Sequence, residues 1–367
     1  MELEDNMKKV LQMASAFIGI IIGAGFASGQ EILQYFVSFG YMGIVAAILA
    51  SALFSFMGMT LTRLGSKMHA TSHSDVIYYI SGRFLGKIID YILIFALFGF
   101  GVVMIAGSGS TLHQQFGFTP IVGSGLMLIL IMLSVMSNVD RIVKVIGSIT
   151  PFLIVSVIFL SIYSFVTKDL TFSELHELSM TQKPAVSNWL ISTLNYVSMN
   201  IVLGASMTIV MGGDEQNEKT AALGGLVGGL GIGLLIIVSY FTIFSNINVV
   251  GQVDMPLLKI ADDLSPMLGI VYSIILYGMI FNTAVSLFYS LGARFADIGS
   301  AKFKWIVTLL GITALVLSFV GFTDLVSLFY PIIGYMGFVL IAVLTFSWFR
   351  TSATSKVDNK MIDKNVS

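Results

Sequence analysis

The sequence predicts an all-α polytopic membrane protein with ten transmembrane helices, arranged as two inverted repeats of five. Three observations carry this prediction. Hydrophobic residues make up 56% of the 367 residues and charged residues only 11%, and the mean hydropathy is +0.93. Runs of about 20 apolar residues, the length that crosses a bilayer as a helix, recur from end to end. The two halves of the chain also match each other at a nearly constant offset.

The first predicted span, residues 8–37, contains a stretch that is a poor helix, Gly23-Ala24-Gly25-Phe26-Ala27-Ser28-Gly29. Glycine inside a helix costs about 1 kcal/mol relative to alanine, so three glycines this close together mark a place where the helix opens. Inside a membrane, an open backbone is tolerated where it is buried in protein or lines a cavity. Many secondary transporters build their substrate site on such a break. The alternative is that the glycines only let a neighbouring helix pack closely.

Nine further apolar spans follow the first. Their predicted bounds are 43–66, 85–112, 120–138, 141–166, 187–213, 219–247, 267–295, 303–322 and 325–349. With the amino terminus inside, sixteen of the 19 Lys and Arg residues fall on the cytoplasmic side, and only Lys168, Lys183 and Lys259 fall outside. Basic residues concentrate in cytoplasmic loops of membrane proteins. We therefore expect ten spans with both termini in the cytoplasm.

The segments between spans complete the predicted organisation. We expect a cytoplasmic amino terminus (1–7), a first repeat (8–166), an extracellular loop (167–186), a second repeat (187–350) and a polar cytoplasmic tail (351–367). The loops 69–82 and 251–266 are long enough to hold short surface helices, and in the loop 172–188 we expect an amphipathic turn around Glu174–Leu178. The chain has no cysteine, which excludes disulfides, thiol catalysis and cysteine-based metal sites.

The internal match is the evidence for the inverted repeat. A shift of 183 residues places Ser28-Gly29-Gln30-Glu31 over Met211-Gly212-Gly213-Asp214, and Gly86 over Gly269. One residue further, Asp140 meets Asp324. Because each half holds an odd number of spans, the second half enters the membrane from the opposite side.

This symmetry predicts a second interruption, in span six. The shift places Gly23 over Ser206, and we expect the break at about Leu203–Met207. Small and polar residues replace leucine around that point: Ser198, Asn200, Gly204 and Ser206.

Ten spans, an inverted repeat and glycine-broken first and sixth helices resemble the amino-acid–polyamine–organocation superfamily. The first-helix stretch from Gly23 to Glu31 is most similar to that of the YkvI-like bacterial membrane proteins. The resemblance covers about residues 8–350. It implies a LeuT-like fold in a bacterial cytoplasmic membrane, and a carrier that imports an amino acid with sodium or protons.

The ends of a broken helix have opposite polarity, which suits a zwitterionic substrate. A first half ending near Ile22 presents carbonyls that attract a cation. A second half starting near Ser28 presents amides that attract a carboxylate. The predicted substrate-binding residues are Gly23, Ala24, Gly25, Phe26, Ala27, Ser28, Gly29, Ser108, Ser198, Asn200, Gly204 and Ser206.

The sequence leaves two candidates for the coupling ion, sodium and the proton. In sodium-coupled relatives, an ion lies between first-helix carbonyls and eighth-helix hydroxyls. By that resemblance the carbonyls belong to Gly19 and Ile22 and the hydroxyls to Thr283 and Ser286. Hydroxyls in spanning helices, however, also bond their own preceding carbonyls. Some proton-coupled relatives use a lysine of span five, where this chain has only Lys144, at the mouth of the span. This observation favours sodium.

Glu31 is the acid that stands out within a span. We expect it above the break, towards the outer vestibule. A desolvated carboxylate there is costly and therefore functional by default; the alternative is a carboxylate on a hydrated vestibule wall.

The sequence favours a secondary transporter without an enzymatic activity, because no nucleophile–base pair or metal motif falls within the spans. The expected partners are an amino acid, a coupling ion and the bilayer; no nucleic acid and no cofactor other than sodium is expected. An amino-acid sensor of the same fold is one alternative. A divalent-metal carrier is another, for which Met199, Asn200 and Met207 supply candidate ligands although the first break has no acid.

Overall fold

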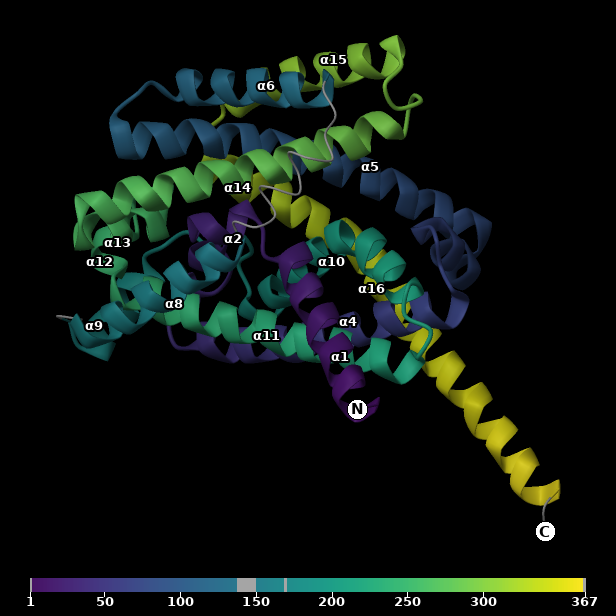
Figure 1. Cartoon of the computed structure of the whole chain (residues 1–367). Helices are drawn as coiled ribbons and strands as arrows, with labels where there is room; N and C mark the ends of the chain where they lie inside the picture. Colours follow the sequence, from purple (N-terminus) through teal and green to yellow (C-terminus); the bar gives the residue numbers. More distant parts are fainter. Residues whose placement is uncertain (1, 137–149, 168–169, 366–367) are drawn as a thin grey trace.

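The computed structural model describes residues 2–136, 150–167 and 170–365, and every regular element within them is helical. Figure 1 shows the arrangement, with the broken first segment inside the bundle. The elements are α1 (Glu2–Ile21), α2 (Ala24–Ser28), α3 (Gln30–Tyr35), the 3-10 turn η1 (Val37–Phe39), α4 (Met42–Met68), α5 (His73–Phe116), α6 (Pro120–Met136), α8 (Thr150–Thr167), α9 (Phe172–Met180), α10 (Trp189–Gly213), α11 (Glu218–Ser245), α12 (Ile247–Val250), α13 (Pro256–Leu264), α14 (Pro266–Ala293), α15 (Ala301–Ser318) and α16 (Phe322–Asn365).

The helices agree with the predicted spans. Among the described residues, seven helices are long and apolar enough to cross a membrane, and α6 and α8 contain shorter apolar segments. The broken segment α1–α3 coincides with the predicted first span. Many large apolar side chains point outward, such as Leu133 (58% exposed) and Leu309 (66%), as a lipid-facing surface requires. The structure is thus consistent with ten spans; Asp140 and Lys144 lie outside the described residues.

Helices that occupy equivalent positions in the two halves pack against each other. The helix α4 packs along α11, α5 along α14, and α6 along α15 (Figure 1). The α4–α11 contact is the closest, because glycine lets the backbones meet: a Cβ on Gly58 would lie 2.5 Å from the carbonyl oxygen of Gly225. Thr62 Oγ1 donates to the carbonyl of Ala221 across the same contact (2.8 Å). Small residues thus hold the two halves together by backbone approach.

The predicted break in the first span is confirmed, but its bounds differ from those expected. The helix α1 ends at Ile21, and Gly23 is extended (φ −106°, ψ −165°). The helix resumes at Ala24, four residues before the expected Ser28. Gly29 then interrupts it again with φ +84°, a left-handed conformation that glycine adopts without strain. The first span therefore has two interruptions that flank the five-residue helix α2.

The predicted break in span six is wrong. The helix α10 runs without interruption from Trp189 to Gly213, through the expected break at Leu203–Met207. A side-chain hydrogen bond from Thr208 to the carbonyl of Gly204 (2.8 Å) follows the helical path. Gly204 serves packing: a Cβ there would lie 2.7 Å from Cδ1 of Ile21. One glycine among good helix formers costs too little to open a helix that is packed along its length.

The short helices expected in the loops are present. The helix α9 lies in the 172–188 loop and begins with a capping box, in which Thr171 and Glu174 each accept a hydrogen bond from the other's backbone. These bonds from Thr171 lower the pKa of the Glu174 carboxyl, because they stabilise its ionised form. The helix α13 occupies the 251–266 loop. A further short helical segment begins at His73 and ends at a kink at Gly82.

Candidate functional site

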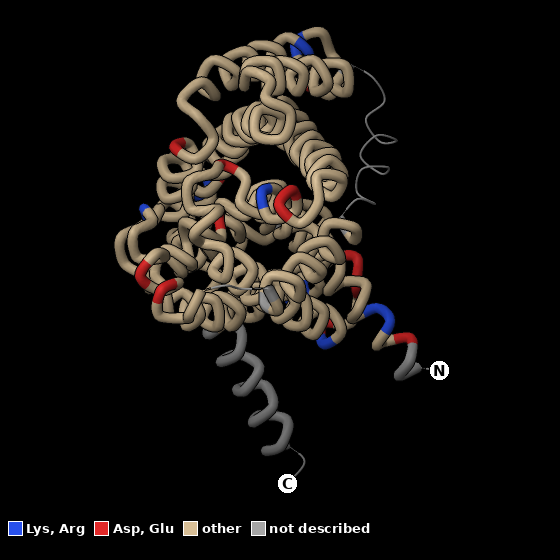
Figure 2. The backbone as a smooth tube through the Cα atoms, turned by 90° about the vertical axis from the view of Figure 1, so that its left-hand side faces the viewer, with Lys and Arg blue, Asp and Glu red and all other residues tan. Residues whose placement is uncertain are grey.

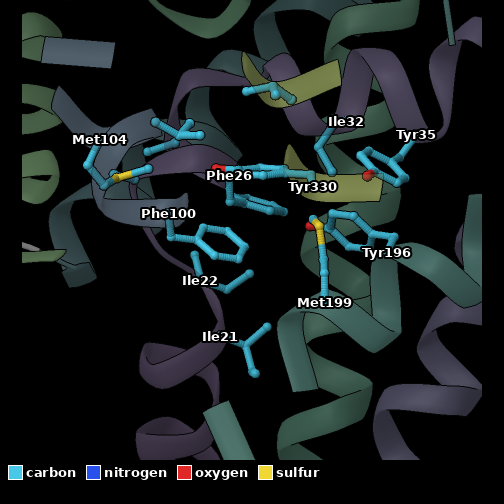
Figure 3. Close-up of a cluster of buried hydrophobic side chains, with 14 of the residues drawn as sticks. Ile21, Ile22, Phe26, Ile32, Tyr35, Phe100, Met104, Tyr196, Met199 and Tyr330 are labelled. Atoms are coloured by element: carbon cyan, nitrogen blue, oxygen red, sulfur yellow. The ribbon is translucent and has the colours of Figure 1, made fainter. Parts of the chain in front are cut away.

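The break in the first span lies in the middle of a buried aromatic cluster. All five residues of α2 are buried. Figure 3 shows Phe26 beside Phe100 and Tyr330, directly after the chain has passed Ile21 and Ile22. The rings of Phe100 and Tyr330 are 4.5 Å apart between centroids. The opened backbone is therefore enclosed by protein, as an interrupted helix in a membrane must be.

Glu31 lies inside this cluster, where only 4% of its surface is exposed. Its carboxylate folds back over α2 and fills the space beside Gly25. A Cβ added to Gly25 would overlap the carboxylate and would lie 2.9 Å from the Tyr330 hydroxyl. The hydrated-wall alternative for Glu31 is wrong in this structure, because the surrounding aromatic side chains exclude water from it.

Two tyrosine hydroxyls from the second half of the chain reach this carboxylate. The hydroxyl of Tyr196, on α10, donates to Oε2 of Glu31 at 3.2 Å. The hydroxyl of Tyr330, on α16, converges on the same point beside Gly25. Tyr35, on α3, packs its ring against Tyr196 (5.3 Å between centroids) and donates to Oδ1 of Asn195 at 3.2 Å.

No basic side chain pairs with Glu31 among the residues that the structure describes. The acid–base pairs there lie at the ends of the bundle: Lys9–Glu215, Arg63–Glu218, His73–Asp90, Lys259–Asp263 and Arg294–Asp90. Most of the chain traced in Figure 2 carries neither basic nor acidic residues. Glu31 is thus a buried acid surrounded by phenols and hydrocarbon.

The predicted substrate residues of the first span are brought together. Ser28 Oγ donates to the carbonyl of Gly25 (2.6 Å) and accepts from the amide of Gln30 (3.1 Å). The carbonyl of Ala27 accepts from the hydroxyl of Tyr272 on α14 (2.7 Å). Gly29 is held close to α13, where a Cβ would lie 2.9 Å from Cγ of Leu257. Together with Gly23, Ala24 and Phe26 they form the α2 segment and its two ends.

The predicted residues of span six divide into two groups. Asn200 Nδ2 donates to the carbonyl of Tyr196 (3.0 Å), and Gly204 packs on the end of α1, so both lie near the break. Ser198 Oγ instead donates to the carbonyl of Gly334 on α16 (2.7 Å). Ser206 is half-buried, farther along α10.

Ser108 is also placed away from α2. Its hydroxyl is fully buried and donates to the carbonyl of Ile105 (2.7 Å), with the carbonyl of Gly123 on α6 at 3.3 Å. The serine therefore joins α5 to α6. Its small, polar surroundings suggested a cavity, but sequence alone does not tell on which side of α5 the residue lies.

The four predicted sodium ligands come from two segments: Gly19 and Ile22 lie at and just after the end of α1, and Thr283 and Ser286 lie on α14. Ile22 is buried. Thr283 Oγ1 lies near Gly23, 3.8 Å from where a Cβ would stand. Ser286 is exposed, and its hydroxyl donates to the carbonyl of Asn282 (2.9 Å).

A second polar cluster, which the sequence did not point to, lies beside the loop helix α13. Asp254 is half-buried and accepts hydrogen bonds from Ser110 on α5 (2.7 Å) and Thr323 on α16 (2.5 Å). Gln34, on α3, donates to the carbonyl of Thr323 (3.2 Å). One loop carboxylate thus ties α5 to α16, and α3 joins them through Gln34.

Tyr196, Tyr330 and Asp254 are the residues that sequence reasoning missed. Tyrosines in apolar spans carry no distinguishing pattern, and an aspartate in a polar loop is unremarkable. A weak signal existed for Tyr196 alone, since it lies in the polar segment of span six that begins at Asn195.

The chain is similar in sequence to two known bacterial proteins. It is 27% identical over 342 residues to YkvI of Bacillus subtilis (strain 168), an uncharacterized membrane protein, and the match covers 93% of this chain and 97% of YkvI. The chain is thus similar to YkvI over nearly its whole length. It is also 27% identical over 328 residues to YyaD of the same organism, across 89% of this chain and 93% of YyaD. The chain matches no protein-family model.

Solved structures similar to this chain establish its fold. MhsT, solved in complex with L-phenylalanine, has a TM-score of 0.59 at 16% identity and covers 89% of this chain and 87% of its own. Inward-facing Mhp1 has a TM-score of 0.60 at 13% identity, with coverage of 89% and 73%. A manganese transporter of Eremococcus coleocola has a TM-score of 0.55 at 12% identity, with coverage of 92% and 78%. The fold is therefore of the LeuT type, as the resemblance implied.

Proposed function

We propose that this protein is a secondary active transporter of a small zwitterionic substrate, an amino acid, working by alternating access. The observation that carries the proposal is the double interruption of the first span, which encloses α2 within the bundle beside a buried acid. A helix break that faced the solvent would be hydrated. The break in the first span is instead lined by Phe26, Phe100, Tyr330 and Met199. It therefore favours a ligand with an apolar part that packs against these side chains.

The interrupted backbone supplies the polar part of such a site. Where α1 stops, its last carbonyls lack partners within the helix, and the first amides of the next segment lack them as well. A zwitterion has an ammonium for the first group and a carboxylate for the second. The aromatic and methionine lining suits an apolar side chain between them. The structural likeness to MhsT, which binds L-phenylalanine, agrees with this choice.

The divalent-metal alternative receives less support. Met199 and Met207 both lie on α10, but Met199 is fully buried and Met207 is 65% exposed. No group of three or more His, Asp or Glu side chains suited to a metal ion occurs among the described residues. The metal-carrying relatives use an aspartate, an asparagine and a methionine at the two breaks, whereas α10, which holds Met199 and Asn200, is continuous.

Uptake into proteoliposomes tests the proposal. Purified protein would first be screened with the twenty common L-amino acids by thermal unfolding, since a ligand stabilises the state that it binds. The amino acid that gives the largest rise in Tm would then be used, radiolabelled, for uptake. Accumulation above the external concentration, abolished by dissipating the ion gradients, is the expected result. Stabilisation without any uptake or exchange would indicate a sensor instead.

A further inference from the structure

We propose that Glu31 carries the proton that couples transport, and that Tyr196 and Tyr330 hold this carboxyl in both of its protonation states. The inference deepens the proposed function and rests on it. It starts from charge. An ionised carboxylate enclosed by protein without a cation is costly, so closing the site requires that a proton or a cation neutralise it.

The surroundings of Glu31 fit a proton better than a metal cation. The titratable groups that face it are all phenols: Tyr196 on α10, Tyr330 on α16 and Tyr35 one turn further along its own helix. No charged side chain pairs with it among the described residues. A hard cation would need several converging oxygen acceptors, whereas here one carboxylate meets hydroxyl groups and aromatic rings.

The two hydroxyls provide a partner in either state, because a phenol both donates and accepts. When Glu31 is ionised, Tyr196 donates to Oε2, and Tyr330 is placed to donate to the oxygen beside Gly25. When Glu31 is protonated, its own O–H needs an acceptor, and the oxygen of Tyr330 is buried and has no hydrogen-bond partner among the described residues. Rotation of the Tyr330 O–H therefore allows Glu31 to bind or release a proton without leaving either of these buried side chains unpaired.

The position of Glu31 links this proton to the substrate. Its carboxylate lies against Gly25, in the middle of the segment between the two interruptions. A substrate that binds the backbone of α2 must displace or contact this carboxylate. Glu31 lies on α3 and its two tyrosine partners lie on α10 and α16, so movement of any of these helices changes the environment of the proton. Binding of substrate and proton are then coupled reciprocally.

Of the candidate sodium ligands, Ser286 has no comparable setting. It is exposed, and its hydroxyl is bonded to the preceding turn of its own helix. Sodium coupling remains as the outcome that would overturn the proposal.

The first experiment reads protonation directly and needs no substrate. Infrared difference spectra of wild type against Glu31→Gln would be recorded in sodium-free buffer over a pH titration. We expect a protonated carboxyl band that is present in wild type, titrates with pH, and is absent from Glu31→Gln. Tyr330→Phe should shift its midpoint, and Glu177→Gln, on the exposed face of α9, should leave it unchanged. A carboxylate that stays ionised until sodium is added would overturn the proposal.

The second experiment reads coupling in proteoliposomes, with L-phenylalanine and the best amino acid of the thermal screen as probes. Wild type should accumulate the probe under an inward proton gradient without sodium. Glu31→Gln should lose accumulation but retain exchange of internal for external probe, and Ser286→Ala should behave as wild type. Sodium-driven accumulation that survives Glu31→Gln and fails in Ser286→Ala would contradict the inference. If wild type neither accumulates nor exchanges any amino acid, the proposed function fails, while the infrared result still decides whether Glu31 binds a proton.

Discussion

The hydroxyl of Tyr196 donates a hydrogen bond to Oε2 of Glu31 across 165 positions of the sequence. It joins the segment after the first break to the helix that occupies the equivalent place in the second half. Phe36 and Phe54 pack edge-on against the same tyrosine ring, at 5.0 and 6.1 Å between centroids, and hold it in place. The acid is thus positioned by contacts between the two halves of the chain.

Gly25 is expected to tolerate no side chain. In Gly25→Ala the added Cβ would overlap the Glu31 carboxylate, so that carboxylate must move away from Tyr196 and Tyr330. Overpacking of this kind costs about 1–3 kcal/mol. We expect a lower Tm and a loss of amino-acid stabilisation in the thermal screen. Gly19→Ala is the control, since nothing lies within 4 Å of its added Cβ; equal losses in both variants would show that the effect is not specific to Gly25.

Asp254 is expected to hold the bundle closed near α13. In Asp254→Ala the hydroxyls of Ser110 and Thr323 lose their shared acceptor, and α5 and α16 are no longer tied to the loop. A cysteine introduced at Gln34 should then react faster with a membrane-impermeant maleimide. Asp263→Ala is the matched control, because in the described part of the chain this aspartate forms an ion pair only with Lys259 of its own helix and lies toward solvent. Unchanged reactivity in Asp254→Ala would mean that the cluster only shapes the loop.

The α4–α11 contact is expected to depend on glycine. In Gly225→Ala the new Cβ would lie 2.3 Å from the carbonyl oxygen of Gly58, and backbone atoms cannot give way as a flexible side chain does. The two helices must separate along their length, and we expect a reduced Tm and a lower yield of monodisperse protein. Gly125→Ala, where the added Cβ meets nothing within 4 Å, should be neutral or stabilising by up to about 1 kcal/mol. Normal stability of Gly225→Ala would refute close packing at this point.

The predicted orientation of the chain is open to test with single cysteines, since the native chain has none. Ser173, on α9, and Thr71, between α4 and α5, are both exposed. With both termini cytoplasmic, Ser173→Cys should react with an impermeant reagent in intact cells, and Thr71→Cys only after permeabilisation. The reverse pattern would invert the orientation, and reaction of both in intact cells would rule out the ten-span arrangement.

The sequence by itself determined those features that depend on local composition. Apolar runs long enough to cross a bilayer located the spans. Gly23, Gly25 and Gly29 predicted the opening of the first span, because three close glycines cost more than a helix interior readily tolerates. A capping residue followed three positions later by glutamate is likewise a local signal, and α9 begins at one. The collinear matches between the halves predicted the inverted repeat.

Only the tertiary structure decided which residues of these elements contact one another. Symmetry predicted a break in span six, but α10 is continuous, since packing along its length outweighs the small cost of Gly204. Ser108 and Ser198 bond carbonyls of neighbouring helices, and which face of a helix meets a neighbour follows from packing partners elsewhere in the chain. The burial of Glu31 depends on tyrosines 165 and 299 positions away. A local pattern carries no information about such partners, because their contact exists only once the two halves have packed together.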